Sequence, residues 1–192
     1  MSRIVLDASV GLALVRAEPS STQIAARMHT WAGEKHELIV PDHFWLEVSN
    51  SLGRRHGWSS SMTFEALHEL DELRITTVAV DRALVLLAIG QMERFDLSSY
   101  DAAYLALAET TRARLATLDR RLLQAAGSMG VDPSGEAPGS GHRLSEERAP
   151  YGEPAAVERR VTWPQWSGAG SYLGTLRRRA LADAEAASSR RG

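Results

Sequence analysis

The chain has 192 residues, of which 44% are hydrophobic and none is cysteine. This length suits one buried core with a small appendage, and the lack of cysteine excludes disulfides and thiolate zinc sites. The net charge of −2 argues against a simple nucleic-acid-binding surface.

Strands and helices alternate along the first two thirds of the chain. In chain order, the apolar patterns predict a strand at 3–7, helices at 9–16 and 20–34, a strand at 36–40, helices at 41–57 and 59–73, a strand at 74–80, helices at 82–95 and 98–109, a strand at 113–119 and a helix at 120–126. Ser20 or Ser21 is expected to cap the second helix, and Asp81 the helix at 82–95. Strands separated by helices imply βαβ units, so the predicted fold is a three-layer α/β/α sandwich around a central parallel sheet.

The composition changes after Gly127. Residues 127–154 are rich in Gly, Pro, Ser and charge without an apolar period, and residues 159–192 carry seven arginines against two acids. We therefore expect a folded domain over residues 1–127, followed over residues 128–192 by a linker and an irregular, poorly ordered C-terminal extension. The alternative is an RNA-binding arm, in which the arginines contact phosphates and Trp163 and Trp166 stack on bases.

The hydropathy pattern bears on localisation. No apolar run approaches the roughly 18 residues that a membrane-spanning helix needs. In the N-terminal stretch MSRIVLDASV, Asp7 interrupts the apolar run, which cannot serve as the apolar region of a secretory signal. We expect a soluble, cytoplasmic protein without a membrane partner.

Two acidic residues follow predicted strands. Asp7 ends the first strand and Asp119 ends the fourth. Ligands of parallel α/β sheets bind outside the carboxyl ends of the strands, which makes both residues candidates for a binding site. Each also has a structural interpretation, because Asp7 can turn the chain and Asp119 can cap the helix at 120–126.

Two further acids lie in predicted helices. Asp101 falls on the same helix face as Tyr104 and Leu105, which is the apolar face expected to meet the core. The pattern Ser98-x-x-Asp101 also fits a capping box at a helix N-terminus. Glu47 flanks an apolar stripe in the helix at 41–57, where an ordinary solvated glutamate is the alternative.

Four converging carboxylates require a compensating cation, because their mutual repulsion otherwise raises their pKa values. Mg²⁺ or Mn²⁺ is the usual choice, since these hard ions take oxygen ligands and keep several waters. Such an ion lowers the pKa of water and neutralises phosphate charge, which suits hydrolysis of a phosphodiester. An acidic site can then hold a polyanion.

The residues around these acids resemble a known family. VLDAS, PDHFWLEVSNSL, LSSYDAAYLALAE and LATLDRRLL are similar, in order and separation, to the four acidic motifs of the PIN domain, and most of all to VapC-type toxins of bacterial toxin–antitoxin pairs. The resemblance covers about residues 1–127. It implies that the catalytic, metal-binding acids are Asp7, Glu47, Asp101 and Asp119, and that the hydroxyls of Ser9 and Thr117 support them.

The resemblance also implies a function. We expect an Mg²⁺- or Mn²⁺-dependent endoribonuclease that acts on an RNA substrate, is held inactive by a cognate antitoxin protein and forms a homodimer. The helices around 22–31 and 63–73 are expected to expose an apolar side for either protein contact.

Two other interpretations compete with this one. A catalytically inactive PIN module, acting in protein binding or autoregulation, is the main alternative. A phosphatase of the haloacid-dehalogenase type needs a second Asp two residues after the first, where this chain has Ser9. The histidines show no metal-ligand spacing. Four arginines near the last motif suit RNA phosphates or a solvated face equally well, and they are Arg112, Arg114, Arg120 and Arg121.

Overall fold

Five parallel strands form the centre of the fold in residues 2–135, the part of the chain that the computed structural model describes. In space their order is β3-β2-β1-β4-β5, with Val5 of the central strand paired to Ile39 on one side and to Leu115 on the other. The strands are β1 (Arg3–Leu6), β2 (Glu37–Pro41), β3 (Thr76–Val78), β4 (Arg114–Ala116) and β5 (Gly130–Val131).

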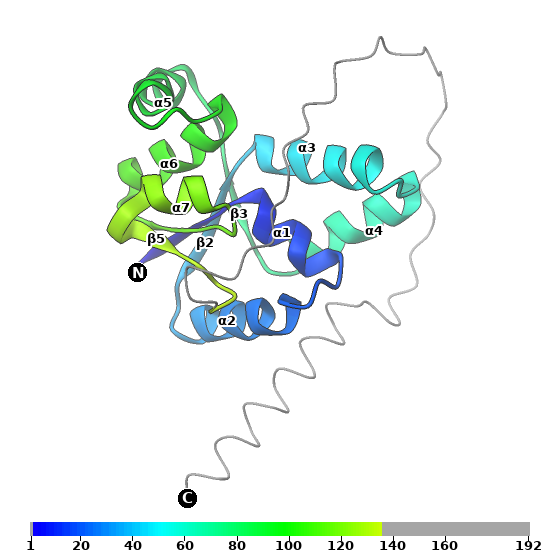
Figure 1. Ribbon diagram of the computed structural model, residues 1–192. Coiled ribbons are helices and arrows are strands. Elements are labelled where there is room, and N and C mark those ends of the chain that lie inside the picture. The colour runs from blue at the N-terminus through cyan, green and yellow to red at the C-terminus, as the bar shows by residue number, and fades with distance from the viewer. Residues whose placement is uncertain (1, 136–192) are drawn as a thin grey trace, which may run out of the picture.

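Helices cover both faces of this sheet. The chain moves outward from β1 to β3 through four helices, then returns across the sheet to β4 through two more. Because such crossovers are right-handed, α1–α4 lie on one face and α5–α7 on the other, as Figure 1 shows. This confirms the predicted three-layer α/β/α sandwich. The helices are α1 (Ala8–Val15), α2 (Ser21–Gly33), α3 (His43–Asn50), α4 (Ser60–Asp71), α5 (Arg82–Phe95), α6 (Ser99–Thr111) and α7 (Arg120–Ala126), with a π-helical turn after α3 (Ser51–Arg55) and a 3-10 turn before β5 (Gly127–Met129).

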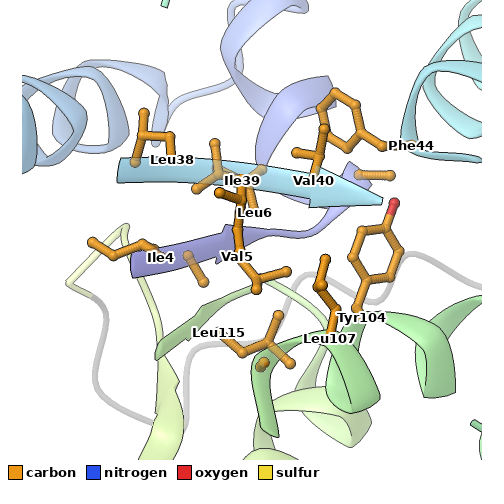
Figure 2. Packing of buried hydrophobic residues seen from close by; sticks show 14 of the residues in the cluster. Ile4, Val5, Leu6, Leu38, Ile39, Val40, Phe44, Tyr104, Leu107 and Leu115 are labelled. Carbon is orange, nitrogen blue, oxygen red and sulfur yellow. The ribbon is translucent and has the colours of Figure 1, made fainter. Parts of the chain in front are cut away.

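The core lies on both faces of the central strands. Ile4, Val5 and Leu6 are at most 1% exposed, which explains why β1 is a continuous apolar run without alternation. Figure 2 shows Phe44 of α3 on one side of β1 and β2, and Tyr104 of α6 on the other. Helices from both outer layers therefore meet at the carboxyl end of β2.

A close contact at Gly11 brings α1 against α3. A Cβ atom at this position would lie 2.8 Å from Cζ of Phe44, whose side chain is fully buried and has little room to move. Only glycine therefore permits this approach. Because α1 begins directly after Asp7 and α3 carries Glu47, the contact draws two of the predicted site acids toward each other.

The predicted elements are confirmed, with shifts of a few residues at their ends, and most of the predicted caps form. Asp81 accepts a hydrogen bond from the backbone N–H of Leu84 at 2.8 Å and caps α5 as expected. The expected cap of α2 is wrong, because Ser20 makes no side-chain capping bond. The Ser21 hydroxyl instead donates to the carbonyl of Ala13 at 2.5 Å and ties α2 to α1.

The sheet extends past the predicted end of the domain. β5 pairs with β4 through Gly130, which lies beyond the predicted end of the domain at Gly127. A strand of only two residues, one of them glycine, has no detectable alternation, so the pattern could not reveal it. Residues 130 and 131 therefore belong to the sheet, while residues 136–192 of the predicted extension lie outside the described residues.

None of the helices in residues 2–135 is long and apolar enough to cross a bilayer.

Candidate functional site

The two strand-end acids lie where the topology of the sheet reverses. β1 and β4 are neighbours, yet the connections around them run on opposite faces, which makes their carboxyl ends a topological switch point. Asp7 directly follows β1, and its backbone N–H donates to the carbonyl of Ala116 in β4 at 3.0 Å. Asp119 begins α7 just beyond β4. The predicted placement of both acids at one edge of the sheet is confirmed.

Asp7 is buried in a network of hydroxyl groups. Asp7 is only 4% exposed. Its Oδ2 accepts hydrogen bonds from Ser9 Oγ at 2.5 Å and from Thr117 Oγ1 at 2.8 Å. These hydroxyls are themselves held, because Ser9 Oγ accepts from the backbone N–H of Leu118 at 3.0 Å and Thr117 Oγ1 from that of Asp119 at 2.9 Å. The network joins the end of β1 to the loop after β4.

The environment disfavours a charge on Asp7. Burial raises the pKa of the carboxyl, the hydroxyls of Ser9 and Thr117 lower it, and the negative charge of Asp119 raises it further, with a net rise. The two hydroxyls therefore only partly compensate for the lost solvation. A nearby cation would remove the remaining cost.

Glu47 reaches the same region from α3. Its Oε2 accepts a hydrogen bond from the hydroxyl of Tyr104 at 3.0 Å. Burial and the negative charges of Asp7 and Asp101 together raise the pKa of Glu47 to about 8, although Tyr104 and Arg55 lower it. The interpretation as an ordinary solvated glutamate does not hold.

Asp119 caps α7 as expected, whereas the cap of α6 is Ser98, whose hydroxyl also contacts the side chain of Asp101. Ser98 Oγ donates to Asp101 Oδ2 at 2.7 Å and accepts from the backbone N–H of Asp101 at 3.1 Å. Asp119 Oδ1 accepts from the backbone N–H of Leu122 at 2.9 Å. These hydrogen bonds hold each carboxylate at the start of its helix.

The four acids form an electrostatic chain. Asp119 acts on Asp7, Asp7 on Glu47, and Asp101 on Glu47. Within residues 2–135, however, no three His, Cys, Asp or Glu side chains lie close enough together to hold one ion between them. The donor chemistry still fits Mg²⁺ or Mn²⁺, because these ions are usually held by one or two carboxylates and several waters.

Two further residues lie near the acids and are not among the predicted site residues. Apolar periodicity places Tyr104 in the core stripe, where its hydroxyl needs a polar partner, but the sequence does not identify that partner as Glu47. Arg55 lies within electrostatic reach of Glu47. Of the arginines that were singled out, Arg121 donates to Asp96 Oδ2 at 2.8 Å.

The fold and the acids define a parallel α/β protein with an acidic edge at its switch point. Residues 4–128 match the PIN domain, more than half of the chain, and the chain therefore belongs to the PIN domain family. None of the curated proteins matches it.

The chain is also similar to solved structures. The chain is 22% identical to VapC20 of Mycobacterium tuberculosis, described as a sarcin-ricin loop cleaving toxin, over 65% of this chain and 95% of that one, with a TM-score of 0.52. It is also similar to PAE2754 of Pyrobaculum aerophilum (21% identity, 66% and 86% coverage, TM-score 0.49) and to a toxin–antitoxin complex of Klebsiella pneumoniae (16%, 68% and 97%, TM-score 0.49). The likeness to VapC20 supports the PIN-like fold.

Proposed function

We propose that this PIN domain is a metal-dependent endoribonuclease and the toxin of a toxin–antitoxin pair. The observation that carries the proposal is the coupling of four acids at the switch point of the sheet. The assigned catalytic and metal-binding residues are Asp7, Glu47, Asp101 and Asp119, and the supporting hydroxyls are those of Ser9 and Thr117.

We assign each acidic side chain a separate role in holding Mg²⁺ or Mn²⁺. Because Ser9 and Thr117 both donate to Oδ2 of Asp7, we assign the other oxygen, Oδ1, to the cation. Glu47 is the second acid and is partly buried, and Asp101 and Asp119 are held at the starts of α6 and α7. A bound divalent ion would lower the pKa of water and neutralise charge on the phosphate.

The test is cleavage by the full chain after removal of metal with a chelator. Single-stranded RNA should be cut only when millimolar Mg²⁺ or Mn²⁺ is restored, and a DNA strand of the same base sequence serves as the control. A chain that neither cuts RNA nor binds Mn²⁺ would contradict the proposal and favour the inactive PIN module.

The proposal of an antitoxin partner rests on the resemblance of the four motifs to those of VapC-type toxins. We propose that a segment of the antitoxin occupies the acidic edge of this chain and blocks access of RNA. We expect the gene next to the one for this chain to encode a small protein with a DNA-binding N-terminal part and an apolar C-terminal tail. Its purified product should suppress cleavage at equimolar concentration.

The apolar surface suited to a homodimer lies on α5. The expected exposure on the helices around 22–31 and 63–73 is wrong, because their main apolar side chains, such as Ile24 and Leu70, are buried in the core. On α5, four apolar side chains are 42–53% exposed, and Figure 1 shows this helix at the periphery beyond α6. A helix that is apolar on several sides is normally covered. The four are Val85, Leu86, Leu87 and Ile89.

We propose that α5 packs against a second copy of the chain. Ile89→Glu should weaken the dimer about 30-fold or more, the effect of losing about 2 kcal/mol of interface energy. Sedimentation equilibrium measures this, with Met62→Glu on α4 as the matched control because Met62 is 48% exposed. A wild-type chain that sediments as a monomer would refute the dimer.

A further inference from the structure

Tyr104 is a buried polar residue beside the acids. It lies in α6, one turn after Asp101, and is fully buried. Figure 2 shows its ring packed under β2 with the hydroxyl oxygen directed toward the carboxyl end of that strand. Its position therefore places one polar atom of the core at the acidic edge of the sheet.

The hydroxyl connects two parts of the site. It donates to Glu47 Oε2 at 3.0 Å, and the backbone of Ala8, the residue after Asp7, hydrogen-bonds to the same oxygen. Tyr104 thereby links the end of β1 to the acid on α3. Only one of the two carboxylate oxygens of Glu47 takes part in this bond.

The ring of Tyr104 is held in place from α3. His43 lies one turn before Glu47 and meets the ring edge-on, with centroids 4.9 Å apart and an interplanar angle of 69°. Tyr104 thus shares one helix with Asp101 and contacts the helix that carries Glu47. A side chain fixed at both its ring and its hydroxyl has little freedom to move.

We infer that Tyr104 is a positioning residue for metal binding: its hydroxyl holds Oε2 of Glu47 and thereby turns Oε1 toward the divalent cation. This inference rests on the proposed function. Groups that orient a metal ligand typically contribute 10- to 100-fold to metal affinity. The competing interpretation is structural, in which Glu47 merely satisfies a buried hydroxyl.

The experiment compares Mn²⁺ affinity of the full chain and its Tyr104→Phe variant by calorimetry. The substitution removes one oxygen and keeps the ring, and we expect the dissociation constant for Mn²⁺ to rise 10- to 100-fold. Tyr100→Phe, which removes an exposed hydroxyl from the same helix, is the matched control and should bind Mn²⁺ as the wild type does.

The same substitution in a Glu47→Ala chain distinguishes a positioning role of Tyr104 from a purely structural one. In a Glu47→Ala chain there is no carboxylate to orient, so adding Tyr104→Phe should change Mn²⁺ affinity less than twofold. If Tyr104→Phe lowers Mn²⁺ affinity equally in both backgrounds, or in neither, the inference is overturned. The proposed function still holds in that case, provided that the wild type binds Mn²⁺ and cleaves RNA. A wild type that neither binds Mn²⁺ nor cuts RNA overturns both.

Discussion

Asp7→Asn should abolish RNA cleavage and leave the protein folded. We expect kcat/KM to fall about a thousandfold or more, which corresponds to about 4 kcal/mol of lost transition-state stabilisation. Asn has nearly the volume of Asp but offers the cation no charge. The measurement is cleavage of a labelled RNA in Mn²⁺, together with growth of cells that express the variant, which should no longer be arrested.

The fold should tolerate this substitution because Asp7 is a costly charge in the metal-free protein. Burial raises the pKa of its carboxyl, and Asp119 adds repulsion. An amide oxygen at the same position can still accept from the hydroxyls of Ser9 and Thr117. The melting temperature should therefore be unchanged or higher.

The control separates local from general charge effects. Asp71→Asn makes the same chemical change on the exposed surface of α4 and should keep full activity. Near-wild-type cleavage by Asp7→Asn would refute the assignment of Asp7 to the metal. Loss of activity with loss of folding would mean only that the buried network needs a carboxylate, and Asp101→Asn, at a partly exposed position, would then decide the question.

The positions of the acids were predictable because they follow from chain topology. Alternating strands and helices require a parallel sheet, and Asp7 and Asp119 follow two strands whose carboxyl ends share an edge. Glu47 and Asp101 required the family resemblance as well, since a glutamate or a capping aspartate in a helix is common. Asp101 shows that the two interpretations coexist: it is bonded to Ser98, the cap of α6, and its charge also acts on Glu47.

Features that depend on packing between distant segments were not predictable. The bond between Tyr104 and Glu47 joins residues 57 positions apart, and apolar periodicity assigns a tyrosine simply to the core. β5 is stabilised by pairing with β4 and has no pattern of its own. The exposure of Ile89 depends on which side of α5 meets α6, and a helix that is apolar almost all round does not specify that side.

Glu47 should make the metal-free protein less stable as the pH rises. Its pKa is about 8 in the folded chain and 4.5 as the reference value, so the folded state binds the proton more tightly than the unfolded state. Stability is then unaffected by this group below about pH 4.5 and falls as the pH rises toward 8. At about 1.4 kcal/mol per pKa unit, the loss is about 5 kcal/mol at most.

The range between pH 6.5 and 8 isolates this effect best. Burial lowers the pKa of His43, so that group acts in the opposite direction and destabilises the fold as the pH falls below 6.5. Between these limits, the melting temperature of the metal-free wild type should decrease with pH. Glu47→Gln should remove most of this decrease, because the neutral side chain has no proton to lose, and should be more stable than the wild type at pH 8.

Mn²⁺ should restore the stability that the wild type loses as the pH rises. A cation that binds only the folded chain stabilises it by about 2.7 kcal/mol at a concentration 100 times its dissociation constant. The gain should be largest at pH 8, where proton competition for Glu47 is weakest, and smaller in Glu47→Gln. Glu65→Gln, on the exposed surface of α4, is the control and should follow the wild type at every pH. If the metal-free wild type and Glu47→Gln instead melt in parallel from pH 6.5 to 8, Glu47 is not the buried acid that the cation compensates.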